Sequence, residues 1–255
     1  MVKKRKSIPL HWQIIIGLVL GLIYSLLATI KGWTDFTSDW ISPFGVIFIN
    51  ALKLIAVPLV LVSLIVGISS MNNIKTLGKM GGKSITLYLI TTVIAISVGL
   101  GLVNVIKPGK FIEEKTRVRL VNKYTDKTSV KVKVANETKD DGPLQPLVDL
   151  VPSNIFKSSS ENKNMLQVIF FAILFGVSMV LIPENKAAPA KAFFESINEI
   201  ILKIVDVIML YAPIGVFALL AGVLVQVSEG NISFAIEILK GLGVYSITVI
   251  LGLAI

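Results

Sequence analysis

Long apolar runs separated by short polar segments make up most of the 255-residue chain. A helix needs about 20 mostly apolar residues to cross the hydrocarbon core of a bilayer. The first run follows a basic start, as a signal peptide would, but its apolar core is too long and no cleavage site follows it. We therefore expect an all-α integral membrane protein with six transmembrane helices, at residues 10–30, 43–70, 84–106, 165–182, 194–227 and 233–255.

The overall composition agrees with a membrane protein. Hydrophobic residues form 54% of the chain and charged residues 16%, whereas a soluble domain has about 25% charged residues. The chain has no cysteine, which excludes disulfides and thiol catalysis. It also has no phosphate-binding loop, Ser-His-Asp set or zinc-ligand spacing, so we predict neither an enzyme nor a cofactor. The net charge of +9 indicates a partner in the anionic bilayer surface, not in nucleic acid.

The distribution of basic residues predicts an orientation. Residues 3–6 are Lys-Lys-Arg-Lys, which favours a cytoplasmic N-terminus. Alternating spans then place 71–83 and 183–193 inside and 107–164 outside. The outer segment holds twelve of the 25 Lys and Arg residues, which conflicts with a simple count of positive charge. Long loops translocate largely regardless of charge, so we predict a multi-pass protein of the inner (cell) membrane with its N-terminus in the cytoplasm.

The long outer loop contains two stretches with an alternating pattern. "TRVRLV" (116–121) and "SVKVKVA" (129–135) alternate polar and β-branched residues and are separated by "NKYTDKT". This period of two predicts an extracellular β-hairpin between the third and fourth helices. A solvated hairpin without a role in transport is favoured over a lid that attracts anions.

A shift of 155 residues brings structural markers into register and suggests an internal repeat. The matched pairs are Gly21 with Gly176, Pro58 with Pro213, and Gly67 with Gly222. Each repeat would hold three spans, so the second would enter the membrane upside down, as in many secondary transporters. We therefore expect an inverted repeat of three plus three helices, although common residues also match by chance.

Three hydroxyl-bearing residues stand in the third apolar run. Tyr88, Thr91 and Thr92 have the spacing i, i+3 and i+4, so they share one helical face. A membrane threonine often bonds back to a carbonyl one turn earlier or joins two helices. The alternative is that these oxygens face a hard cation. Spacing alone favours the packing role.

Charged residues inside the spans have structural and functional interpretations. Lys53 lies near the outer end of the second span, where its ammonium can reach the interface. Asp206 in the fifth span has Lys203 three residues earlier on the same helical face. We expect these two to form a structural ion pair, in preference to a proton-relay carboxylate.

Several long motifs together resemble the dicarboxylate/amino acid:cation symporter family, the glutamate transporter family. Residues 43–68, "PFGVIFINALKLIAVPLVLVSLIVGI", resemble its second span. The other motifs are "LGKMGGKSITLYLITT" (77–92) and "IKPG" (106–109) for the third span, "LVDLVPSNIF" (147–156) and "MLQVIFFAILFG" (165–176) for the fourth, and "MLYAPIGVFALLAG" (209–222) for the fifth. The resemblance covers nearly the whole chain outside the predicted hairpin.

The resemblance implies that the spans belong to two domains with different roles. Residues 1–76 and 147–230 would form a scaffold that assembles as a homotrimer. Residues 77–109 and 231–255 would belong to a mobile transport domain, and 110–146 would be the extracellular loop. The family's elevator mechanism would carry the substrate across the membrane against the fixed scaffold.

The resemblance also implies a chemistry. It predicts sodium-coupled symport of a small anionic substrate, which would be glutamate, aspartate or a C4-dicarboxylate, with sodium as the coupling ion. Tyr88, Thr91 and Thr92 match positions of a sodium-binding face, with threonine allowed at the last, and the match favours the cation role. Lys53 would be a candidate lining residue of the family's anion pathway. The alternative is that its ammonium group only reaches the membrane interface.

The chain lacks part of the family's pattern. The serine-rich hairpin tip, the Asn-Met-Asp-Gly-Thr break and the Asp/Arg pair that hold the substrate do not occur, and the sequence ends within the sixth span at "SITVILGLAI". We therefore expect the N-terminal portion of a longer transporter, with no substrate-binding residue and one wall of a sodium site, and no transport by this chain alone. The alternatives are a non-transporting trimeric membrane scaffold and an anion channel through the domain interface.

Overall fold

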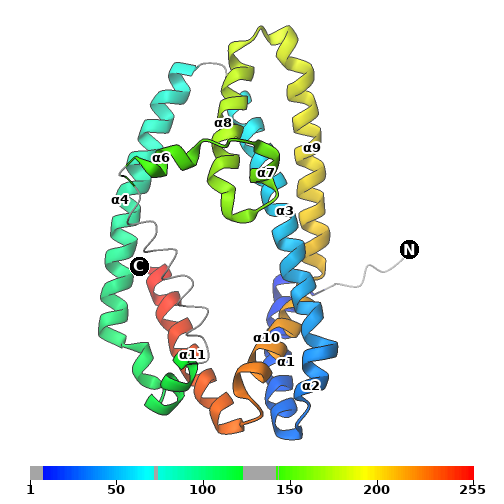
Figure 1. Cartoon of the computed structure of the whole chain (residues 1–255), viewed down its shortest axis with the longest axis vertical. Coiled ribbons are helices and arrows are strands. Elements are labelled where there is room, and N and C mark those ends of the chain that lie inside the picture. The colour runs from blue at the N-terminus through cyan, green and yellow to red at the C-terminus, as the bar shows by residue number, and fades with distance from the viewer. Residues whose placement is uncertain (1–7, 72–73, 123–141, 143) are drawn as a thin grey trace, which may run out of the picture. The chain divides into compact units, whose positions relative to one another are not determined.

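The computed structural model describes residues 8–71, 74–122, 142 and 144–255, and all regular structure in these ranges is helical (Figure 1). The elements are α1 (Leu10–Lys31), α2 (Thr34–Phe36), η1 (Thr37–Ile41, a π-helix), α3 (Ser42–Ser69), α4 (Ile74–Ile106), η2 (Pro108–Phe111, a 3₁₀-helix), α6 (Gln145–Leu150), α7 (Ile155–Ser159), η3 (Asn162–Asn164, a 3₁₀-helix), α8 (Met165–Leu181), α9 (Glu184–Leu210), α10 (Ala212–Ser228) and α11 (Ile232–Ala254). One further helix, at residues 114–122, follows η2.

Six helical stretches of the described chain are long and apolar enough to cross a membrane, which confirms the predicted six spans. They are Leu10–Lys31, Thr34–Ser69, Gly81–Phe111, Asn162–Leu181, Glu184–Ser228 and Ile232–Ala254. The second begins earlier than predicted because α2 and η1 lead directly into α3. The fifth begins earlier because α9 adds an amphipathic first half that the apolar run alone did not reveal.

The two matched prolines have different effects on their helices. Pro213 lies in the first turn of α10, directly after α9 has ended at Leu210. A proline costs little there because the first amide groups of a helix have no partner within the helix. Pro58 lies inside α3, which continues from Ser42 to Ser69. Only Pro213 therefore coincides with a helix boundary.

The predicted strand over 116–121 is wrong, because residues 114–122 are helical. Within this helix the Thr116 hydroxyl donates a hydrogen bond to a Glu237 carboxylate oxygen in α11. The Arg119 guanidinium lies 5.2 Å from the ring centre of Phe234, also in α11. Positions 116 and 119 share a helical face, so contacts with α11 outweigh the weak β pattern. The second predicted strand, 129–135, lies outside the described residues.

The described chain divides into two compact units, and the first comprises residues 1–77 and 147–230. In this unit α1 packs along α10, and α3 packs against α8, α9 and α10. Glycines allow the close approach of helices on which membrane proteins depend. A Cβ atom added at Gly21 would lie 2.8 Å from the carbonyl oxygen of Phe217, and one at Gly45 would lie 2.7 Å from the amide nitrogen of Leu219.

Buried hydroxyl groups also join α1 to α10. The Thr29 and Ser228 oxygens lie 3.2 Å apart, and both side chains are buried. The Thr29 hydroxyl donates to the Ser25 carbonyl at 2.8 Å, and the Ser228 hydroxyl can donate either to the Thr29 oxygen or to the Val225 carbonyl at 3.1 Å. Each hydroxyl therefore has a partner, as a buried polar group requires.

The second unit comprises residues 78–146 and 231–255. The motif "IKPG" ends α4: Lys107 adopts a left-handed conformation with φ 50°, and Pro108 starts η2. The segment that follows packs on α11, where Ile112 occupies the space over Gly241. Asn231 begins α11 by accepting a hydrogen bond from the Phe234 amide at 3.2 Å.

Candidate cation-binding face of α4

The three predicted cation ligands lie on α4, within about a turn of one another. Tyr88 is 74% exposed, and the Thr91 and Thr92 side chains are exposed as well. No residue in the most apolar part of this span is buried within the described structure. The hydroxyl face is therefore accessible to a ligand or to another protein segment.

Backbone hydrogen bonding leaves the threonine oxygen available. The Thr91 hydroxyl donates to the Leu87 carbonyl at 2.9 Å, with the Tyr88 carbonyl at 3.2 Å. This is the back-bonding expected for a threonine in a membrane helix. Because the hydroxyl hydrogen is engaged, the oxygen lone pairs remain free to accept, and a cation requires lone pairs.

The oxygens on this face form an incomplete coordination shell. One helix face supplies the hydroxyls of Tyr88, Thr91 and Thr92, whereas hard cations in proteins are usually surrounded by about six oxygens. The described residues contain no cluster of three acidic or histidine side chains that could complete a metal site. The arrangement fits one wall of a cation site and does not form a closed one.

Lys53 lies in the first unit, exposed on α3. It lines an open groove of about 770 Å³ together with Pro58 on α3, Phe171 on α8 and Ile201 on α9. The Asn162 side-chain amide donates to the Lys53 carbonyl at 3.3 Å. The lysine thus stands at the edge of a largely apolar groove, a position that agrees with either role considered for it.

The predicted ion pair in the fifth span is confirmed. Lys203 Nζ lies 3.1 Å from Asp206 Oδ2, at i,i+3 on α9, and both side chains are exposed. A carboxylate that is paired on the surface of its own helix has a structural explanation, so the pair gives no reason to assign a proton relay.

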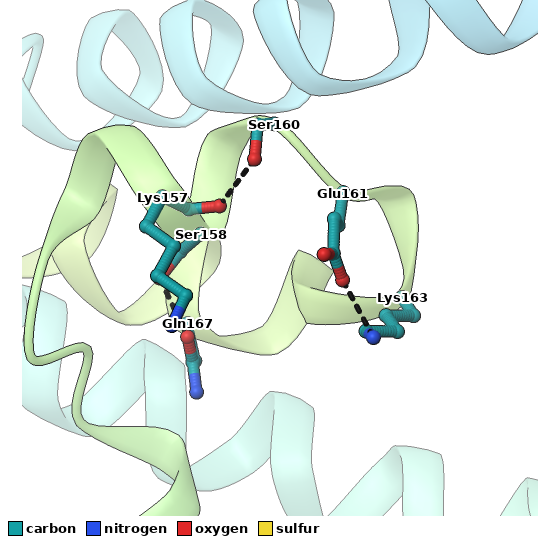
Figure 2. Close-up of polar contacts among 6 residues, drawn as sticks. All are labelled: Lys157, Ser158, Ser160, Glu161, Lys163 and Gln167. Carbon is teal, nitrogen blue, oxygen red and sulfur yellow. Dashed lines mark hydrogen bonds and ion pairs between the residues drawn. The ribbon is translucent and has the colours of Figure 1, made fainter.

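The serines of "SSSEN" (158–162) make local structural contacts in the turn between α7 and α8. Ser158 donates to the Gln167 side-chain oxygen at 2.6 Å, and Ser160 donates to the Lys157 carbonyl at 2.7 Å (Figure 2). Asn154 caps α7 by accepting from the amides of residues 156 and 157. This turn is therefore held by its own side chains.

The same turn has one acidic group with a shifted pKa. Lys163 Nζ lies 2.6 Å from Glu161 Oε2 (Figure 2). The hydrogen bond from Lys163 and its positive charge, with a smaller effect from Lys157, lower the pKa of Glu161 below its ordinary value. A lowered pKa means that the pair stabilises the turn above the ordinary glutamate pKa and is lost as pH falls through the lowered one.

Replacing Lys163 by methionine is expected to raise the pKa of Glu161 towards the ordinary glutamate value, because both main causes of the shift come from that ammonium group. Carboxyl chemical shifts of labelled glutamate, followed through an acid titration, would measure it. Lys157→Met is the control and should give a smaller change. An unchanged titration in Lys163→Met would show that the pair does not persist in solution.

Six apolar spans define a multi-pass membrane protein, and the long helix α4 exposes uncharged side-chain oxygens. The sequence pattern of the sodium:dicarboxylate symporter family matches residues 10–255, and the chain belongs to this family. The resemblance seen in the motifs is thereby confirmed.

Curated relatives agree with this assignment. The chain is 36% identical over 236 residues to the proton/sodium-glutamate symport protein of Geobacillus stearothermophilus, covering 92% of this chain and 52% of the relative. It is 35% identical to the proton/glutamate-aspartate symporter of Escherichia coli (strain K12), covering 86% and 49%. It is 31% identical to the C4-dicarboxylate transport protein of Bacillus subtilis (strain 168), covering 86% and 47%. The chain thus spans about half the length of these relatives, which are transporters and not enzymes.

Proposed function

We propose that this chain forms the six-span portion of a sodium-coupled symporter of acidic amino acids or C4-dicarboxylates in the inner membrane, with a cytoplasmic N-terminus. The family match over residues 10–255 carries the proposal. The relatives named for glutamate, aspartate and C4-dicarboxylate transport support the substrate class. The hydroxyl face of α4 supports a cation role, in which Tyr88, Thr91 and Thr92 contribute ligands.

An elevator mechanism requires one part of the protein to move and another to stay fixed. The first compact unit, 1–77 with 147–230, supports assignment as the scaffold, and we propose that it forms the trimer contacts. The second unit, 78–146 with 231–255, supports assignment as part of the transport domain. Coupling then arises because cation binding favours the state that binds substrate, so that each ligand raises the affinity for the other.

The glycine contacts of the first unit support the inverted repeat. Gly21 in α1 packs on Phe217 in α10, and Gly176 in α8 packs on Ile68 in α3. In the proposed repeat, the first span of each half thus packs against the second span of the other half. A twofold relation between the halves would produce this exchange of partners.

A chimera tests the transport function directly. In it, this chain replaces the corresponding half of the Geobacillus stearothermophilus relative, which supplies the remaining half. Proteoliposomes that contain the chimera are expected to accumulate labelled glutamate or aspartate when an inward sodium gradient is imposed, and to accumulate much less with choline in place of sodium.

The chain alone is the control and is expected to give no uptake, because the family's substrate-binding motifs are absent from its 255 residues. A chimera that assembles and is as heat-stable as the parent but shows no sodium-dependent uptake would contradict the proposal. A substrate-independent anion current from the purified chain alone would instead favour the channel alternative, with Lys53 in its pathway.

A further inference from the structure

A second face of α4 combines two lysines with two glycines. Gly78, Lys79, Gly82, Lys83 and Thr86 line a shallow hollow of about 540 Å³, which continues to Leu87 and Ile90. The Lys79 and Lys83 side chains are exposed, and no ion pair involves either of them among the described residues. The Thr86 hydroxyl donates to the Gly82 carbonyl at 3.0 Å, along its own helix.

The two lysines of the hollow lie on the side of α4 opposite to Tyr88. At 3.6 residues per turn, Lys79 lies about 180° and Lys83 about 140° around the helix from Tyr88. A helix that turns its hydroxyl face towards the rest of the transporter therefore turns its lysine-glycine face away. For a membrane-spanning helix, that direction leads to lipid.

The depth of the lysines matches the edge of a bilayer. The stretch from Lys83 to the end of α4 at Ile106 is about 35 Å long at 1.5 Å per residue, close to the roughly 30 Å of a hydrocarbon core. Lys79 lies one turn farther out, about 6 Å beyond Lys83. Both ammonium groups can therefore reach the phosphate layer.

The hollow has a cationic end and an apolar end, which match the anionic headgroup and the acyl chain of a lipid. It is cationic at Lys79 and Lys83, carries a hydroxyl at Thr86, and becomes apolar at Leu87 and Ile90. Gly78 and Gly82 leave open space, since a Cβ atom at either position would meet nothing within 4 Å. A headgroup phosphate would pair with the lysines, and the start of an acyl chain would lie along the apolar end.

We propose that this face of α4 binds one anionic phospholipid, with the phosphate between Lys79 and Lys83 and the glycerol region over Gly82. A lipid fits better than a soluble anion because the apolar half of the hollow would contribute nothing to a free phosphate. The site is separate from substrate and cation binding, and its test does not depend on transport.

Lipid retention by the purified chain, measured by native mass spectrometry in detergent, tests the site. Phosphatidylglycerol is expected to bind at least about fivefold more tightly than phosphatidylcholine, in line with the attraction of lysines near an anionic surface. The double variant Lys79→Gln, Lys83→Gln should lose that preference. Gly82→Leu should weaken binding of phosphatidylglycerol without changing charge, because the leucine fills the hollow.

The matched control is Lys186→Gln with Lys191→Gln on α9, in the segment 183–193 that we place on the same side of the membrane. This pair removes the same charge and is expected to leave phosphatidylglycerol affinity within about twofold, since neither lysine lines the hollow. The proposal is overturned if the control lowers affinity as much as the Lys79 and Lys83 pair, or if Gly82→Leu has no effect. Displacement of the lipid by glycerol phosphate or by polyglutamate would also overturn it, because the face would then belong to a soluble phosphate or to an acidic protein segment.

Discussion

Replacing Gly21 by leucine is expected to destabilise the first unit by about 3 kcal/mol, the upper end of the usual range for overpacking. A Cβ at this position would lie 2.8 Å from the Phe217 carbonyl oxygen and 3.2 Å from the Phe217 Cα. Both are backbone atoms of α10, so the helix as a whole would have to move away. The apparent Tm of the purified chain in detergent, followed by size-exclusion chromatography after heating, measures the effect.

Gly67→Leu is the matched control in the same unit. Gly67 lies inside α3, and a Cβ there would meet no atom within 4 Å. The change removes a poor helix former, whose cost in a helix interior is about 1 kcal/mol, so the Tm should stay level or rise. An unchanged Tm in Gly21→Leu would mean that α1 and α10 do not pack as described.

The double variant Thr91→Val, Thr92→Val is expected to raise the sodium concentration for half-maximal uptake by about tenfold, the equivalent of about 1.4 kcal/mol of lost cation affinity. Valine keeps the shape of threonine and removes the oxygen, so α4 should fold as before. Sodium titrations of substrate uptake by the chimera, made at saturating substrate, give the measurement.

Ser97→Ala is the control for this experiment. Ser97 is exposed on α4, and its hydroxyl donates to the Val93 carbonyl at 2.8 Å, the same type of bond that Thr91 makes. It lies about 180° around the helix from Tyr88, so its loss should leave sodium dependence unchanged. Equal sodium dependence in the threonine variant and the parent would remove these residues from the cation site.

The sequence predicted the spans well because hydrophobic length is a direct physical requirement of the bilayer. It underestimated the fifth span, since the start of α9, before residue 194, carries the charged residues Glu184, Lys186 and Lys191, which an apolar window excludes. It failed at 116–121, where alternating Thr, Arg and Val residues fit a strand as well as a helix. The contacts of Thr116 and Arg119 with α11 come from more than a hundred residues away and leave no local signal.

The candidate sites were predictable to different degrees. The spacing of Tyr88, Thr91 and Thr92 is enough to place them on one helical face, but a spacing cannot say what covers that face. The residue pattern alone does not single out the lysine-glycine face, although Gly78, Lys79, Gly82 and Lys83 form two i,i+4 pairs. Open space beside the glycines does not distinguish it either, since a Cβ at Gly81, Gly99 or Gly101 of α4 would also meet nothing within 4 Å. What marks this face is the hollow that the two lysines line.

The hydrogen-bonded contact between Thr29 and Ser228 joins residues 199 positions apart. At a synthesis rate of roughly 5–20 residues per second, α1 is made about 10–40 s before its partner on α10. During that interval α1 lies in the bilayer without α10, the helix against which Gly21 packs. Insertion of the first helix and formation of its native packing are therefore separate events, divided by the time taken to synthesise most of the chain.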